Sequence, residues 1–486
     1  MSSTFSTIPQ TRELSLSQPS MPPTPPHIAV VPSPGLSHLI SLGEFSRRLV
    51  RRFNFSVTII IPTNAPPSKV QDAFLASLPS AISHLLLPPV CLADLPPAAG
   101  LVTRISVTMA RSIPSLYDAL KDLAASANLA AMVVDIFGAD TFAMAREFKS
   151  PPYIYFLSTA MLLSLLFHLH TLDKTVSCEF GELAEPVQIP GCIPVHGKDL
   201  VYSVQDRKSE AYKWYLHHAE LYATAEGVIV NTFTDLEPGP IKALQKIGKP
   251  PIYTVGPIIQ MELHEPKGPT ECLKWLDDQP SGSVLFVSFG SGGRLSHDQV
   301  IELALGLELS EQRFLWVAKP PDKTAEGGYF TVETQGEMLP FLPKGFVERT
   351  EGRSLVISTW APQVKVLGHG STGGFLTHCG WNSILENIVH GNGVPFVAWP
   401  LFAEQNMNAA LVTDGLKVGL RPTAGENGVV GREEIARIVK IVMAGDQAQT
   451  FRRRIKGLKS SALKTLSEDG DSDKALCEVA KKWMHE

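Results

Sequence analysis

The 486-residue sequence has no surplus of positive charge and no long apolar run. Its 43 Lys and Arg against 48 Asp and Glu give a net charge of −5. Nucleic-acid binding needs a concentrated positive surface, so we predict no nucleic-acid partner. The longest apolar run, Ala160 to Phe167, is too short to cross a bilayer, so we predict no membrane span. The 44% hydrophobic content excludes disorder of the whole chain.

Cysteine is also scarce, and its spacing carries no metal or disulfide pattern. The six cysteines are scattered without a C-x-x-C pair, which favours a reducing, cytoplasmic setting and no metal site. Residues 1–26 are rich in Ser, Thr and Pro and lack the apolar core of a secretion signal. We predict a disordered tail there, with a plastid transit peptide as the alternative.

From residue 27 onward, β-branched apolar runs alternate with helical patterns, which is typical of parallel sheets covered by helices on both faces. Between residues 236 and 282 the sequence becomes rich in Pro, Gly and Lys, and the alternation then restarts. The predicted class is α/β with two Rossmann-like domains. We place them at residues 27–255 and 256–470, and expect a last helix over 471–486 to pack back on the first domain. The strands of this prediction lie within 27–35, 56–63, 129–135, 153–159 and 227–232 in the first domain, and within 283–293, 314–319, 355–359, 373–378 and 394–400 in the second.

Two chemically active residues follow strands of the first predicted sheet. His38 comes after the turn that ends the first strand, and Asp135 ends the strand LAAMVVD. Ligands of open α/β sheets bind beyond the carboxyl ends of the strands, so both belong at one edge. A His oriented by a carboxylate is a general base. A His in a helix cap and an ordinary N-cap Asp remain the alternative.

A glycine-rich turn, Ser288 to Gly293, follows the first strand of the second domain and precedes a helix that Ser296 and Gln299 open as a capping box. Small residues there allow backbone N–H groups to approach a phosphate. The next strand ends in Lys319 rather than an acidic residue, which disfavours a dinucleotide cofactor such as NAD.

The densest signal runs from Trp360 to Gln405. His378 ends a strand, and the following helix presents its positive N-terminus with Asn382 and Ser383 as added donors, which suits a pyrophosphate. Glu386 lies one turn further and suits ribose hydroxyls. A buried structural His378 and a core Trp381 are the alternative.

The segment WAPQVKVLGHGSTGGFLTHCGWNSILENIVHG…VPFVAWPLFAEQ resembles the sugar-donor box of the plant family 1 glycosyltransferases, which use UDP-sugars. PPHIAVVPSPG, AMVVDIFGADTFAMA, IPGCIPVHGKDL and SVLFVSFGSGG look like the hydroquinone glucosyltransferase (arbutin synthase) branch, so the resemblance runs over nearly the whole chain from residue 27. It implies a GT-B fold, with two Rossmann-like domains facing each other across a cleft. It also implies inverting, metal-independent transfer of glucose from UDP-glucose to a small phenol, with no tightly bound cofactor. We also expect a monomer.

The resemblance also implies a role for each matching residue. His38 corresponds to the general base and Asp135 to the acid that orients it. The remaining positions correspond to donor ligands: Thr159 and Trp381 near the sugar, Ser291, His378, Asn382 and Ser383 at the phosphates, Trp360, Ala361 and Gln363 at uracil and ribose, Glu386 at ribose, and Glu404 and Gln405 at sugar hydroxyls. Gln405 at the last position goes with glucose. The phenol is expected to lie against residues 77–120 and 160–215, with Phe137, Phe156 and Leu157 as apolar candidates.

Three positions depart from the family pattern. Ser37 stands where Gly is usual, Ser41 where Pro is usual, and the box is lengthened near Asn392 and Gly393. Asn-Gly is turn chemistry, so we expect a bulged loop there and an active enzyme. The alternatives are a non-catalytic UDP-sugar-binding protein and an NAD-dependent dehydrogenase.

Overall fold

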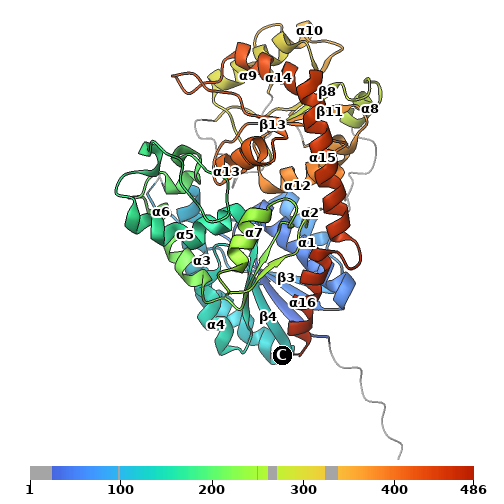
Figure 1. The fold of residues 1–486 in the computed structure, drawn as a ribbon. Helices are drawn as coiled ribbons and strands as arrows, with labels where there is room; N and C mark the ends of the chain where they lie inside the picture. Colours follow the sequence, from blue (N-terminus) through green and yellow to red (C-terminus); the bar gives the residue numbers. More distant parts are fainter. Residues whose placement is uncertain are drawn as a thin grey trace, which may run out of the picture.

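The computed structural model describes residues 25–96, 99–248, 250–260, 271–322, 338–358 and 360–485. They form two parallel sheets, each covered by helices, in two lobes stacked one above the other (Figure 1). This confirms the predicted class of two Rossmann-like α/β domains. The predicted tail, residues 1–26, falls outside the described residues except for its last two. In the described residues no helix is long and apolar enough to cross a membrane.

The first sheet has the strand order β3-β2-β1-β4-β5-β6-β7, with all neighbours parallel. Its strands are β1 (His27–Val31), β2 (Ser56–Ile61), β3 (Ile82–Leu86), β4 (Leu129–Val134), β5 (Pro152–Phe156), β6 (Gly227–Val230) and β7 (Ile252–Thr254). The helices of this half are α1 (Leu36–Phe53), α2 (Lys69–Ala76), α3 (Leu101–Ser126), α4 (Phe142–Glu147), α5 (Ala160–Thr175), α6 (Glu210–Tyr222) and α7 (Pro238–Gln245).

The second sheet repeats the same topology with the order β10-β9-β8-β11-β12-β13. Its strands are β8 (Val284–Ser288), β9 (Arg313–Val317), β10 (Ser354–Ile357), β11 (Thr372–Thr377), β12 (Phe396–Ala398) and β13 (Gly419–Leu420). The helices are α8 (Glu271–Asp277), α9 (His297–Ser310), α10 (Phe346–Arg349), α11 (Gln363–Gly368), α12 (Trp381–His390), α13 (Gln405–Ala410), α14 (Arg432–Met443), α15 (Gly445–Leu466) and α16 (Asp471–His485).

Each sheet reverses its strand order once, and this reversal places the site. In the first sheet β1 pairs with β2 on one side and β4 on the other. In the second sheet β8 lies between β9 and β11 in the same way. Loops leaving the two central strands at such a point diverge to opposite faces, and the gap between them is where these folds bind ligands. The first of these switch points lies at the carboxyl ends of β1 and β4, and the second lies at the carboxyl ends of β8 and β11.

The central strands are buried apolar runs, which is why the sequence pattern predicts them. β4 and β5 are buried at every position. Three strands lie outside the prediction because their pattern is weak. β3 is an edge strand with one buried residue, β7 has three residues and β13 has two.

The last helix returns from the second lobe to the first (Figure 1). α15 runs along the side of the molecule, and α16 then packs beside the first sheet. The indole of Trp483 lies edge-on to Phe55 and Tyr153, with ring centroids 6.0 and 5.2 Å apart. The chain therefore passes from the first sheet to the second after β7 and returns to the first sheet with α16, which begins at Asp471. A last helix over 471–486 is what the sequence predicts. The limits of the two domains remain a prediction.

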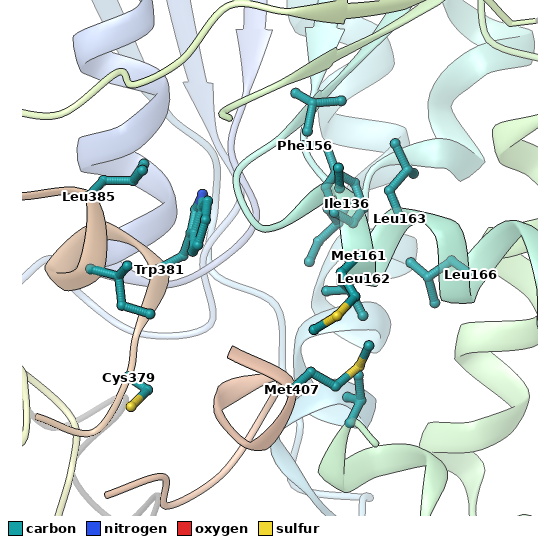
Figure 2. Close-up of a cluster of buried hydrophobic side chains, with 14 of the residues drawn as sticks. Ile136, Phe156, Met161, Leu162, Leu163, Leu166, Cys379, Trp381, Leu385 and Met407 are labelled. Carbon is teal, nitrogen blue, oxygen red and sulfur yellow. The ribbon is translucent and has the colours of Figure 1, made fainter. Parts of the chain in front are cut away.

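A cluster of buried apolar side chains joins the two lobes. Figure 2 shows Trp381 and Met407 of the second lobe facing Ile136 and Met161 of the first, and these side chains belong to one buried cluster. The Trp381 Nε1–H also donates to the Asn231 carbonyl at the end of β6, at 2.7 Å. Side chains of both lobes therefore pack in one buried apolar cluster.

Candidate active site

His38 and Asp135 meet at the switch point of the first sheet. His38 lies in the first turn of α1, and Asp135 directly follows β4. The His38 Nδ1 and Asp135 Oδ2 atoms are 2.7 Å apart, and both residues are buried. Because the carboxylate holds the proton on Nδ1, the Nε2 lone pair is left free to accept a proton.

Asp135 is itself held in place by its neighbours. Its Oδ2 accepts from the Ser33 backbone N–H at 2.6 Å, and its Oδ1 accepts from the Ser33 hydroxyl and, at 3.2 Å, the Phe137 N–H. The carboxylate has no solvent exposure, so these bonds replace its hydration. The structure therefore builds an oriented His–Asp pair, and Ser33 is a supporting residue that the sequence prediction missed.

The glycine-rich turn after β8 packs against His378, which follows β11. Gly290 has a φ of +72°, and a Cβ there would lie 2.6 Å from the His378 Nε2. Only glycine fits both the backbone and the space. Burial lowers the pKa of His378 to about 4, so its ring is neutral near pH 7. The predicted phosphate residues Ser291 and His378 are thus brought together.

The N-terminus of α12 opens beside His378. Gly380 precedes the helix, and Asn382 and Ser383 lie in its first turn, where backbone N–H groups have no intrahelical partner. The Asn382 Oδ1 is buried and without a partner among the described residues. Helix dipole, free N–H groups and short polar side chains together make this end suitable for an anion.

The predicted base and ribose ligands form a linked group. The Gln363 amide donates to the Ser383 hydroxyl at 2.9 Å and to the Glu386 carboxylate at 2.7 Å. Burial raises the pKa of Glu386 to about 7. Trp360 is 63% exposed, an unusual state for an indole, while Ala361 is buried. An exposed indole beside a polar group suits a flat ring ligand.

Glu404 and Gln405 lie between the two lobes at the start of α13. Burial raises the pKa of Glu404, and the neighbouring His38 of the first lobe acts against this shift. The Gln405 Oε1 accepts from the backbone N–H groups of Leu401 and Phe402, at 2.9 and 3.1 Å. Its amide nitrogen is therefore the end that can reach a ligand.

Two predicted sugar neighbours make hydrogen bonds within the protein that stabilise the fold. Thr159 is fully buried and caps α5 by accepting from the Leu162 N–H at 3.0 Å. The Trp381 indole is committed to the bond with Asn231 in the other lobe. For both, contact with a donor sugar stays a prediction.

Among the apolar candidates for the acceptor, Phe137 lies beside the candidate base, with its ring centroid 6.1 Å from that of His38. Phe156 belongs to the core and packs edge-on against Tyr222, and Leu157 is partly buried. An open groove of about 840 Å³ lies elsewhere, between α9 and α14, and none of the predicted site residues lines it.

The two lobes are also tied together beside the candidate sugar ligands. The Tyr202 N–H of the first lobe donates to the Ala403 carbonyl at 2.9 Å. Arg421 of the second lobe donates to Asp199 at 2.7 Å and to Asn406. Nothing in the sequence pattern predicts the Tyr202–Ala403 and Arg421–Asp199 contacts, because the two residues of each pair lie in different lobes and far apart in the sequence. They fix the Glu404 loop against the first lobe.

Two Rossmann-like domains, with the His38–Asp135 pair at one switch point and the N-terminus of α12 at the other, place the protein in the class of GT-B glycosyltransferases. The family model "UDP-glucoronosyl and UDP-glucosyl transferase" matches residues 208–445. Hydroquinone glucosyltransferase of Rauvolfia serpentina is 59% identical over 94% of this chain and 98% of its own. The chain therefore belongs to the plant family 1 UDP-glycosyltransferases, and it is an enzyme that uses a UDP-sugar.

Solved structures agree with this assignment. Phytolacca americana UGT2, complexed with UDP-2-fluoro-glucose and pterostilbene, is 52% identical with a TM-score of 0.88 over 95% of this chain and 100% of its own. A Polygonum tinctorium UDP-glucosyltransferase capable of glucosylating indoxyl, complexed with 3,4-dichloroaniline, has the same identity and TM-score and covers 95% of this chain and 99% of its own.

Proposed function

We propose that this enzyme transfers glucose from UDP-glucose to the hydroxyl of a small phenol such as hydroquinone, with inversion and without a metal. The observation that carries the proposal is the buried His38–Asp135 pair facing the Glu404 loop of the other lobe. The relatives support the substrate class, since one is named for hydroquinone and another was solved with the phenol pterostilbene.

A phenol is a weak nucleophile at neutral pH because its pKa is near 10. The His38 Nε2 removes the phenolic proton as the oxygen attacks the anomeric carbon of glucose. The C–O bond to the diphosphate breaks in the same step, and UDP leaves with the electron pair. A single displacement from the opposite face converts the α-linked donor to a β-glucoside. A positioned base of this kind contributes roughly 10²–10⁴-fold to the rate.

The donor lies against the second lobe in this proposal. The diphosphate meets the N-terminus of α12, His378, Asn382, Ser383 and the turn at Ser291, which stabilise the charge that develops on the leaving UDP. Uracil stacks on Trp360 beside Ala361, and the ribose hydroxyls donate to Glu386, which Gln363 already orients. Glu404 and the Gln405 amide bind the glucose hydroxyls, with Thr159 and the Trp381 backbone nearby.

We propose that no metal is needed, because the hydrogen-bond donors named above already stabilise the charge on the leaving UDP. We also propose that the enzyme acts in the cytoplasm as a monomer. All six cysteines are unpaired, which suits a reducing compartment.

The test is to incubate the protein with UDP-glucose and hydroquinone in the presence of a chelator. We expect UDP and a β-glucoside, identified by mass spectrometry and by the anomeric coupling in NMR. His38→Ala should reduce kcat at least about a hundredfold while UDP-glucose still binds. Tight binding of UDP without transfer to any phenol would instead indicate the non-catalytic alternative. An α-glucoside, or activity lost with the chelator, would contradict the mechanism.

A further inference from the structure

One cation next to the candidate diphosphate site has no role in the mechanism above. Lys319 lies two residues after β9 and reaches the neighbouring loop after β8. Its Nζ donates to the carbonyls of Gly290 and Ser291, both at 2.5 Å. An ammonium has three N–H donors, and these two acceptors are uncharged, so the bonds hold the group without neutralising its charge.

The site needs such a charge if the proposed function holds. The diphosphate of UDP-glucose carries two negative charges, whereas Ser291, Asn382 and Ser383 are neutral. His378 is neutral as well, since burial and the nearby charge of Lys319 lower its pKa to about 4. The mechanism therefore supplies helix and backbone dipoles but no full positive charge.

The neighbouring cation faces a different part of the turn. Arg294 donates to the Gly293 carbonyl at 3.3 Å. Burial lowers the pKa of Arg294, and the nearby charge of Asp322 acts against this shift. Asp322 follows Lys319 in the same loop, and its N–H donates to the Leu295 carbonyl. Lys319 is thus bound to Gly290, which packs on the His378 ring, and to Ser291, whereas Arg294 is bound to Gly293 further along the turn.

We propose that Lys319 is a positioning residue for the donor: its ammonium holds the turn at Gly290 and Ser291 against His378 and supplies the positive charge that the diphosphate requires. The proposal rests on the function proposed above. Lys319 acts through the turn, whose backbone N–H groups then point in a fixed direction toward the N-terminus of α12. Loss of the ammonium releases the turn and lowers donor affinity, while the acceptor side is unaffected.

This role has a pH signature. Burial, with a smaller contribution from Arg294, lowers the pKa of Lys319 to about 7. The protonated form, which holds the turn, is therefore present below pH 7 and is lost as the pH rises above it. UDP-glucose stays doubly negative over this range, and His378 titrates well below it, so neither masks the effect. Glu386, whose pKa is also about 7, changes donor binding in the opposite direction and is common to all variants compared.

The experiment measures UDP-glucose affinity by calorimetry from pH 6 to 8.5, without acceptor, for the wild type, Lys319→Met and Lys319→Arg. We expect Lys319→Met to weaken binding at pH 6 about tenfold or more, as for loss of a charged hydrogen-bonding group. Lys319→Arg, which stays charged at every pH, should bind within about threefold of the wild type at pH 6. The ratio of the wild-type Kd to the Lys319→Arg Kd should rise with pH.

Lys459→Met is the matched control. Its ammonium also donates to two carbonyls, those of His390 and Gly391, and burial also lowers its pKa, but it lies at the far end of α12. We expect unchanged UDP-glucose affinity in this variant, and an unchanged KM for hydroquinone in Lys319→Met.

Two outcomes overturn the proposal. Lys319→Met binding UDP-glucose within about twofold of the wild type would remove the role of the ammonium, as would identical pH profiles for the wild type and Lys319→Arg. If these results come with a wild type that binds and transfers glucose normally, only the role of Lys319 fails. If the wild type itself neither binds UDP-glucose nor transfers it, the proposed function fails as well.

Discussion

Asp135→Asn is the sharpest test of the proposed His38–Asp135 pair, because it replaces the charged carboxylate with a neutral amide of almost the same volume. The carboxylate accepts four hydrogen bonds, from the His38 ring, the Ser33 N–H and hydroxyl, and the Phe137 N–H. An amide offers one acceptor oxygen, and its NH₂ group must face a donor in either orientation. When the NH₂ faces His38, the ring takes the tautomer with the proton on Nε2, which cannot act as a base.

The magnitude follows from these contacts. A hydrogen bond to a charged group contributes roughly 1.5–3 kcal/mol. At 1.36 kcal/mol per tenfold, its loss from the transition state slows transfer by about 10- to 150-fold. Loss of the correct tautomer adds to this, up to the roughly 10²–10⁴-fold that the base contributes. We expect kcat to fall about a hundredfold or more, with the affinity for UDP-glucose unchanged.

The assay is steady-state transfer to hydroquinone, with donor affinity and thermal unfolding measured on the same samples. Glu237→Gln is the control, because Glu237 is another buried carboxylate of this domain that accepts from the Ala160 and Met161 N–H groups, both at 2.9 Å, but does not touch His38. It should lose stability with a loss of kcat well below tenfold. The double variant His38→Ala, Asp135→Asn should be no slower than His38→Ala alone, since the pair acts as a unit. Independent, multiplying effects, or an Asp135→Asn enzyme within about fivefold of the wild type, would refute the pairing.

Further predictions concern the donor side and the join between the lobes. Because burial raises the pKa of Glu386 to about 7, its charged form appears as the pH rises through 7. Calorimetry should therefore show that the ratio of the Glu386→Gln Kd to the wild-type Kd for UDP-glucose increases from pH 6 to 8. A constant ratio would contradict the role of Glu386 in ribose binding. Gly290→Ala places a methyl group 2.6 Å from the His378 ring at a φ of +72°, so donor affinity should fall at least about tenfold, at a conformational cost of roughly 1–2 kcal/mol; unchanged affinity would show that the turn does not contact the donor. Trp381→Phe removes the 2.7 Å bond to the Asn231 carbonyl and should lower the unfolding midpoint by a few degrees, for a loss of about 1 kcal/mol; an unchanged midpoint would mean that this bond does not stabilise the join. Deleting Asn392 and Gly393 should leave the KM for UDP-glucose within about threefold of the wild-type value. Asn392 lies beyond the C-terminal end of α12, where it donates to the Gly368 carbonyl, and β12 keeps its pairing with β11. A larger change in KM would show that the two additional residues of the donor box take part in donor binding.

Much of the fold could be predicted from the sequence because the central strands are continuous apolar runs. β1, β4, β5 and β8 each follow that pattern. Asp135 directly follows β4, His378 directly follows β11, and His38 lies beyond the turn after β1. The two-residue β13 and the exposed edge strand β3 lack any such pattern, since neighbouring strands rather than their own side chains stabilise them.

The site was harder to predict where it depends on contacts between residues that are far apart in the sequence. The His38–Asp135 distance depends on the strand order of the sheet, which places β1 beside β4 although 97 positions separate the two residues. Ser33 could have been suspected from its place in the turn after β1. The contact of Lys319 with Gly290 and Ser291 depends on β9 lying beside β8, which the sequence does not state. Bonds between the lobes, such as that of Arg421 with Asp199, arise from the docking of two separate folds.

In the proposed mechanism the two lobes together build one active site, with the base on the first lobe and the donor on the second. A crystal structure of the enzyme with UDP and hydroquinone tests it most directly. We expect a phenolic oxygen within hydrogen-bonding distance of the His38 Nε2, the diphosphate at the N-terminus of α12 beside His378, and uracil stacked on Trp360. A diphosphate bound elsewhere, or a phenol remote from His38, would contradict it.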